Sequence, residues 1–98
     1  MKPCWFHPKA LEEADQAAAF YRAQQPGLEV RFLEALNDAI SRIRRNPFLY
    51  RCIESDIRKC RIMRFPYGVI YRATEDSVQV IAIMHLRQRP DYWKSRAE

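Results

Sequence analysis

Between residues 57 and 89 the apolar and polar positions alternate in a way that predicts three consecutive β-strands. Alternate side chains of a strand point to opposite faces, so Cys60 and Ile62 are expected on one face of the first strand. The opposite face then carries a row of three side chains, which are Lys59, Arg61 and Met63. Two turns are predicted between these strands, because Phe-Pro-Tyr-Gly combines proline with glycine and Glu-Asp-Ser is entirely polar.

The third predicted strand, Val78–Met84, is apolar at almost every position. A short apolar run of this kind is typical of a central strand covered on both faces, although a buried helix segment can look similar. The β-branched residues and the preceding hairpin favour a strand. His85 continues the parity of Ile81 and Ile83, so it is either a hydrogen-bonded residue at the strand end or a titrating group of a site.

Two amphipathic helices are expected before these strands. A first strand is expected over Lys2–His7, and Pro8 is well placed as the first residue of a helix over Pro8–Gln24. A Gln-Gln-Pro-Gly break separates it from a second helix over about Leu28–Arg45, which ends before Asn-Pro. Residues Phe48–Asp56 are expected to form a connecting loop. The short link between the helices predicts an antiparallel hairpin whose apolar stripes need a sheet to cover them.

The predicted fold class is α+β: a helix hairpin packed on a mainly antiparallel four-stranded sheet, in the order β-α-α-β-β-β, with a short C-terminal tail or helix. At 98 residues the chain is expected to be a single domain spanning residues 1–98. Three acidic residues, Glu12, Glu13 and Asp15, lie early in the first helix, where the helix dipole favours negative charge. We interpret them as helix-stabilising rather than catalytic, because this segment offers no second titrating partner.

The formal net charge of the chain is +5, and the excess is confined to its second half. Residues 1–56 hold 8 basic and 8 acidic residues, whereas residues 57–98 hold 9 basic and 4 acidic residues. Of the 17 basic residues 13 are arginines, whose planar guanidinium suits phosphate and carboxylate partners. This distribution predicts an acidic partner, either nucleic acid or an acidic protein segment. The alternative is a basic surface that only aids solubility.

No apolar run reaches the roughly 20 residues of a membrane span, and the N-terminal residues have no apolar core long enough for a secretion signal. A cytoplasmic location without a membrane partner is therefore expected. Three widely spaced cysteines, Cys4, Cys52 and Cys60, fit reduced thiols better than a disulfide framework. The sequence has no cysteine–histidine cluster and no glycine-rich phosphate loop, so neither a metal nor a cofactor is expected.

The residues that follow the third strand combine guanidinium and aromatic side chains. Such a segment could read an anion or stack on a base through Arg87, Arg89, Tyr92 and Trp93. In the alternative interpretation Tyr92 and Trp93 pack back over the helices, and Arg89 pairs with Asp91. The alternative is favoured for the two aromatic residues, because large aromatic side chains mostly serve in cores.

Short motifs are spread over nearly the whole chain. In order they are Phe6-His7-Pro8, Phe20-Tyr21, Pro26-Gly27-Leu28, Phe65-Pro66-Tyr67, Ile70-Tyr71, His85, Arg87, Pro90 and Tyr92-Trp93. Their order and spacing together resemble the ParE/RelE superfamily of toxins from type II toxin–antitoxin systems. The resemblance is greatest to the ParE-like branch, whose members are often described as plasmid stabilisation proteins. It implies the same fold, a helix hairpin on a mainly antiparallel sheet.

The resemblance implies one of two activities. RelE-like members cut mRNA in the ribosome with basic side chains and an aromatic residue, whereas ParE-like members poison DNA gyrase. The residues that match the nuclease pattern here are Lys59, Arg61, Arg87 and Tyr92. Both branches usually carry an arginine directly after the Phe-Pro-Tyr motif, but this chain has Gly68. The missing charge favours the ParE-like interpretation, in which no residue is catalytic and the protein is a toxin that arrests growth.

Under the ParE-like interpretation the candidate target-binding residues are Lys59, Arg61, Arg64, Arg87, Arg89, Tyr92 and Trp93. The expected partners are DNA gyrase as the target and a cognate antitoxin that lies along the helix hairpin and the sheet edge. The ribosome and mRNA are the alternative target, and operator DNA is expected only through the antitoxin. A third alternative is a non-toxic antitoxin-binding module, because Gly68 and Gln88-Arg89 depart from the family pattern.

Overall fold

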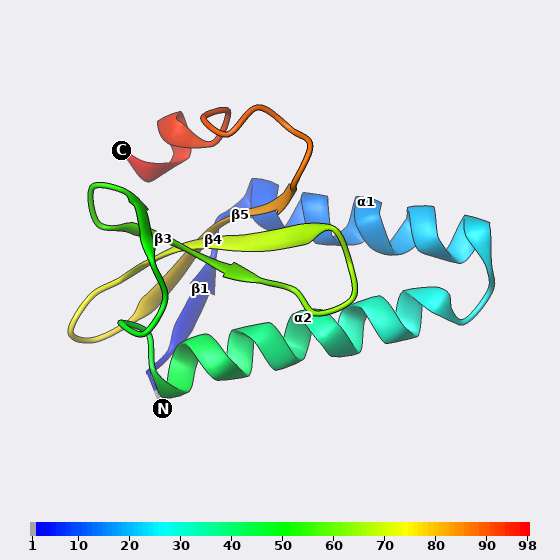
Figure 1. Ribbon diagram of the computed structural model, residues 1–98, viewed down its shortest axis with the longest axis horizontal. Coiled ribbons are helices and arrows are strands. Elements are labelled where there is room, and N and C mark those ends of the chain that lie inside the picture. Colours follow the sequence, from blue (N-terminus) through cyan, green and yellow to red (C-terminus); the bar gives the residue numbers. More distant parts are fainter. Residues whose placement is uncertain (1) are drawn as a thin grey trace.

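The computed structural model describes residues 2–98, which form two α-helices and five strands (Figure 1). In chain order the elements are β1 (Cys4–Phe6), α1 (Pro8–Gln24), α2 (Leu28–Arg45), β2 (Cys52–Glu54), β3 (Ile57–Arg61), β4 (Tyr67–Ala73), β5 (Val78–His85) and the 3₁₀ helix η1 (Lys94–Ala97). The α+β class, the helix hairpin and the bounds of both helices are as the sequence predicts.

The five strands form one sheet in the order β1-β5-β4-β3-β2. Strand β1 runs parallel to β5, and the other neighbours are antiparallel. The expectation of four strands is wrong by one, because β2 lies within the expected loop Phe48–Asp56 and pairs with β3. All three residues of β2 are exposed, and the register shifts between Cys52 and Glu54. A short edge strand that buries no side chain leaves no apolar alternation in the sequence.

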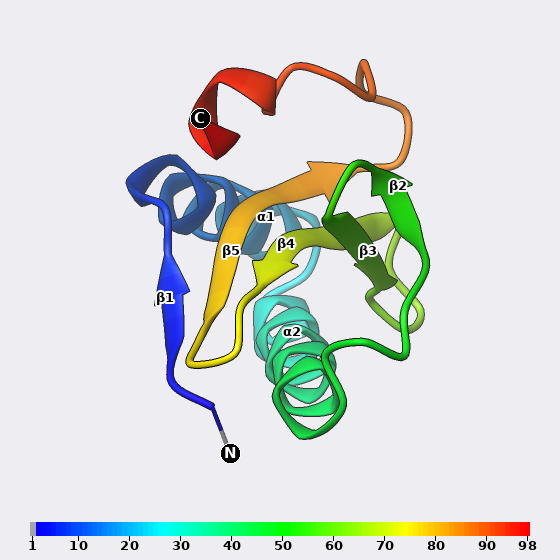
Figure 2. The ribbon, with the colours of Figure 1, turned by 90° about the vertical axis from the view of Figure 1, so that its left-hand side faces the viewer.

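The helix hairpin covers one face of the sheet, and the C-terminal segment covers the other (Figure 2).

Pro8 occupies the first turn of α1, where a missing N–H has no cost, and His7 Nδ1 accepts a hydrogen bond from Lys9 N at 3.1 Å. The turn between the helices requires Gly27, whose φ of 98° lies in the left-handed region. These local features explain why the sequence predicts both the first residue of α1 and the turn between the two helices.

Apolar side chains form a separate core on each face of the sheet. The larger core lies between the helices and the sheet and includes Phe32, Leu36 and Tyr71, whose hydroxyl donates to the Pro47 carbonyl at 2.6 Å. The smaller core lies on the other face, which we call the tail face. Its buried members are Ile57, Ile70, Ile81, Ala82, Met84 and Trp93. The sheet is therefore covered on both sides, as the apolar run of β5 predicts.

Strand β5 carries one extra residue relative to β4. Two steps along β5, from Val80 to Ala82, face a single step along β4, so Ile81 forms a bulge. The bulge changes which side chains share a face: Val80 and Ile83 lie in the larger core, whereas Ile81 and Ala82 lie in the smaller one. The expectation that Ile81 and Ile83 share a face is therefore wrong, because a bulge leaves no signature in a run that is apolar at consecutive positions.

The cysteine thiols, all free, lie in different surroundings. Cys60 is fully buried, and burial raises the pKa of its thiol above the ordinary value of 9.0, whereas Cys52 is exposed on β2. The thiolate is the reactive form, so iodoacetamide at about pH 8 should alkylate Cys52 at least roughly tenfold faster than Cys60. Peptide mass spectrometry over a time course measures both rates. Equal rates in the folded protein would contradict the burial of Cys60.

Candidate target-binding surface

Two basic side chains of β3 point to the tail face of the sheet. Across the β3–β4 ladder Lys59 pairs with Ile70 and Arg61 pairs with Gly68, which itself pairs with Met84 on β5. Paired residues share a face, and Ile70 and Met84 belong to the core of the tail face. Arg61 is exposed there, and Lys59 is half-buried. The shared face that strand alternation predicts for Lys59 and Arg61 is confirmed.

The side chain of Lys59 lies across Gly68. A Cβ atom at position 68 would be 3.1 Å from Cγ and 3.2 Å from Cδ of Lys59. A larger residue at this position would therefore have to displace the lysine stem, which is flexible. A side chain at position 68 would occupy the space that the Lys59 stem fills, so in this chain Lys59 is the residue that carries the positive charge there.

Arg64 lies beyond the end of β3, in the turn between β3 and β4. Its φ of 71° is in the left-handed region, and its side chain lines a groove of about 880 Å³ beside α2. Aromatic rings from both sides of this groove, Tyr21 and Phe65, pack edge to face with centroids 4.9 Å apart. The candidate target-binding residues of β3 and of the turn after it are thus divided between the tail face, which carries Lys59 and Arg61, and this groove, which Arg64 lines.

The loop after β5 is folded against the β3–β4 turn. Leu86 N donates to the Pro66 carbonyl at 2.9 Å, and Arg87 N donates to Nδ1 of His85 at 3.0 Å. These bonds place Arg87 at the end of the sheet where β3 finishes. His85 is therefore a hydrogen-bonded residue at the strand end, with its ring 5.0 Å from that of Tyr67.

We call Arg61, Arg64 and Arg87 the basic end of the sheet. All three are exposed, and no guanidinium among them forms a hydrogen bond or an ion pair with any residue of the described range 2–98. Arg89 differs, because its Nε lies 3.6 Å from Oδ1 of Asp91, as the alternative interpretation of the tail expects. Three unpaired guanidiniums make this end of the sheet attractive to an acidic partner.

Trp93 is not on the surface, although it was a candidate for target contact. Its side chain is 2% exposed and packs in the core of the tail face with Ile57 and Met84. Its Nε1 finds no hydrogen-bond acceptor within residues 2–98. The tail does pack back on the protein, but Trp93 covers the sheet face opposite the helices rather than the helices themselves. A target cannot reach this indole in the present conformation.

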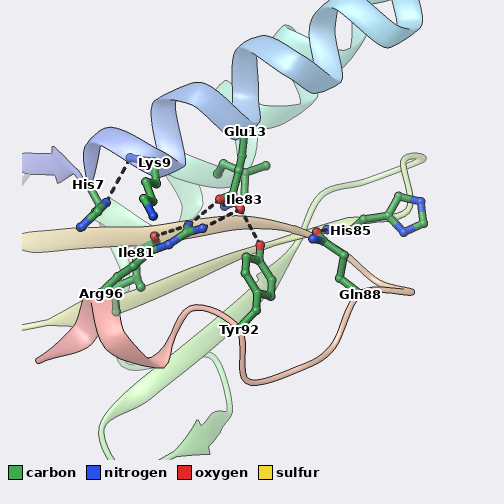
Figure 3. Close-up of polar contacts among 9 residues, drawn as sticks. All are labelled: His7, Lys9, Glu13, Ile81, Ile83, His85, Gln88, Tyr92 and Arg96. Atoms are coloured by element: carbon green, nitrogen blue, oxygen red, sulfur yellow. Dashed lines mark hydrogen bonds and ion pairs between the residues drawn. The ribbon is translucent and has the colours of Figure 1, made fainter.

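Tyr92 is held at α1. Its hydroxyl donates to Oε2 of Glu13 at 2.7 Å, and burial, followed by this hydrogen bond, raises the pKa of Tyr92. Arg96 completes the cluster with bonds of 2.8 and 3.1 Å to the two carboxylate oxygens (Figure 3). The first helix itself offers Glu13 no titrating partner, as expected, but the C-terminal segment supplies two partners from outside the helix. The partners are 79 and 83 residues away in sequence, and the local signal was only that Glu13 precedes the buried Ala14.

The Tyr92 hydroxyl lies apart from the basic residues that match the nuclease pattern. The Tyr92 hydroxyl is bonded at α1, which packs on β5, whereas Lys59 and Arg61 lie on β3, and β4 separates β3 from β5 (Figure 2).

Within residues 2–98, no His, Cys, Asp or Glu side chains are grouped so as to hold a metal ion. In the same range, no helix has the length and apolar character needed to cross a membrane.

Comparison with known proteins gives a consistent result. The model of one family, described as the ParE toxin of type II toxin-antitoxin system, parDE, matches residues 5–90. No curated protein shows significant similarity to the chain. Ten chains of solved structures match, among them one from the chromosomal ParDE TA system from P. aeruginosa. That match has a TM-score of 0.75 at 16% identity and covers 87% of this chain and 96% of the other, so it supports the fold.

Proposed function

The chain belongs to the ParE toxin family of type II toxin–antitoxin systems, and from this premise we propose that it arrests bacterial growth by binding DNA gyrase through the basic end of the sheet. The observation that carries the proposal is the exposure of Arg61, Arg64 and Arg87 without partners within residues 2–98. Three guanidiniums at one end of the sheet, none with a carboxylate partner within residues 2–98, suit an acidic surface of another molecule.

The geometry favours binding over RNA cleavage. Cleavage requires an acid or base beside cations that stabilise the developing charge. The hydroxyl of Tyr92 is engaged by Glu13, and Gly68 supplies no charge between Lys59 and the end of the sheet. The chain therefore has exposed cations placed for recognition, while the tyrosine hydroxyl of the nuclease pattern is held away from them.

The antitoxin is proposed to bind along the groove beside α2 and along the outer edge of β2. The groove is lined by the aromatic side chains of Tyr21 and Phe65 and by both signs of charge, with Arg31 and Arg64 near Glu34 and Asp38. This lining suits an amphipathic segment that places its acidic residues opposite the two guanidiniums. A segment in the groove would cover Arg64, so neutralisation would follow from occlusion of the basic end. The exposed edge strand β2 can accept an extended segment by strand addition.

Macromolecular synthesis after induction of this chain alone tests the proposal. Labelled thymidine and labelled methionine are followed in parallel in a bacterium during the first minutes. We expect thymidine incorporation to fall first, together with gyrase-linked DNA breaks. An earlier fall in methionine incorporation, with cut transcripts, would instead support a ribosome-dependent ribonuclease. Normal growth with abundant folded protein would contradict toxicity and leave an antitoxin-binding module.

A further inference from the structure

Strand β5 has an open edge beyond the point where β1 stops. Strand β1 pairs with β5 only as far as Phe6, and the chain then enters α1. Beyond it, side chains replace the missing strand: Glu13 Oε1 accepts from Ile83 N at 3.0 Å, and Arg96 Nη1 donates to the Ile81 carbonyl at 3.2 Å. In a parallel sheet one residue of the neighbouring strand supplies such an acceptor and donor. The Glu13–Arg96 pair therefore takes the place of one strand residue.

Glu13 joins three parts of the molecule at this edge: α1, β5 and the C-terminal segment (Figure 3). Its side chain is 17% exposed and that of Arg96 is 11% exposed, and the Arg96 guanidinium lies 5.0 Å from the centre of the Tyr92 ring. A shielded ion pair stabilises a fold little more than apolar residues of the same size would. Its distinctive effect is to admit only one arrangement of its partners, so this clamp defines where Tyr92 and Arg96 lie.

The basic loop, residues 86–91, runs between two anchors and contains no helix or strand. At its start Leu86 N donates to the β3–β4 turn at 2.9 Å, and at its end Tyr92 donates to Glu13 at 2.7 Å. Arg87 lies on this loop and is exposed. Loop positions are set by their anchors, so the placement of Arg87 at the basic end depends on Glu13 as well as on the turn.

We propose that Glu13 is a positioning residue of the toxin, which holds Tyr92 and Arg96 so that the basic loop presents Arg87 beside Arg61. This inference rests on the proposed function. Glu13 acts through its partners and touches no target, because its carboxylate is enclosed by them. Release of the clamp should weaken growth arrest while the helix hairpin and the sheet keep their structure.

The substitution Glu13→Gln separates the two halves of the clamp. The amide oxygen can still accept from Ile83 N, but the charge and the second carboxylate oxygen, which Tyr92 and Arg96 share, are lost. Glu12→Gln is the matched control, since it makes the same change at the exposed neighbour on the same helix. Tyr92→Phe removes a single hydroxyl bond and provides a milder second variant.

Hydrogen–deuterium exchange and growth arrest at matched protein levels are measured on all four chains. In Glu13→Gln the amides of residues 86–98 should exchange roughly tenfold faster or more, with those of β3–β5 unchanged, and growth arrest should weaken. Tyr92→Phe should show a smaller acceleration, and Glu12→Gln should match the wild type. A general contribution to stability would instead accelerate exchange in the sheet and the tail alike.

Two results would overturn the positioning role. One is unchanged exchange of residues 86–98 in Glu13→Gln, and the other is faster exchange together with full growth arrest. If the wild-type chain did not arrest growth, this result would contradict the proposed function instead. The exchange measurement needs no toxicity, so the two failures are distinguishable.

Discussion

Replacement of Trp93 by alanine should lower the free energy of unfolding by about 3–5 kcal/mol, the range typical of large aromatic side chains removed from cores. The indole is among the largest fully buried side chains and lies between the C-terminal segment and the tail face of the sheet. Its removal would leave a cavity against Ile70 and Met84, which the strands cannot close without breaking their ladder. Urea unfolding followed by circular dichroism measures the change.

Trp5 provides a matched control for this prediction. It is 64% exposed on β1, so Trp5→Ala should change the free energy of unfolding by no more than about 0.5 kcal/mol. Trp93→Phe should cost less than Trp93→Ala, because it keeps an aromatic ring and removes an N–H group that has no acceptor within residues 2–98. Equal stability of the two alanine variants would contradict the burial of Trp93.

The parts of the fold that the sequence predicts are those whose signals are local. Both helices have an apolar period together with a proline start or a glycine break, and their bounds agree with the structure. The two features that sequence reasoning missed in the sheet have no local signal. Strand β2 buries no side chain, and the bulge at Ile81 lies among consecutive apolar residues from Val80 to Met84. Pairing with neighbours, rather than composition, creates both features.

The candidate site likewise contains residues whose placement follows from local signals and residues whose placement does not. Strand alternation correctly places Lys59 and Arg61 on one face, because it depends only on residues two apart. Strand alternation makes no prediction for Arg64, because this residue follows the end of β3 and adopts a left-handed backbone conformation. Trp93 and Glu13 depend on contacts between the two ends of the chain. A carboxylate beside a buried alanine stripe was the single sequence feature that pointed to a partner for Glu13.

Reversal of charge at the basic end should have the largest effect on function. Arg61→Glu and Arg87→Glu are each expected to weaken binding to purified DNA gyrase at least about tenfold, and the double substitution about 100-fold. Growth arrest should be lost in the double variant. Both side chains are exposed and unpaired within residues 2–98, so the fold should be retained. Binding isotherms at two salt concentrations measure the effect, and the wild type should lose more affinity at high salt than the double variant.

Arg45→Glu controls for net charge, because it makes the same change at an exposed residue at the C-terminal end of α2, away from the β3–β4 turn (Figure 1). If Arg45→Glu weakened binding as much as Arg61→Glu, the attraction would depend on total charge rather than on a defined surface. If neither Arg61→Glu nor Arg87→Glu weakened binding, the basic end would not contact the target. A binding surface built from β3 and the loop after β5 requires that affinity falls for Arg61→Glu and Arg87→Glu and not for Arg45→Glu.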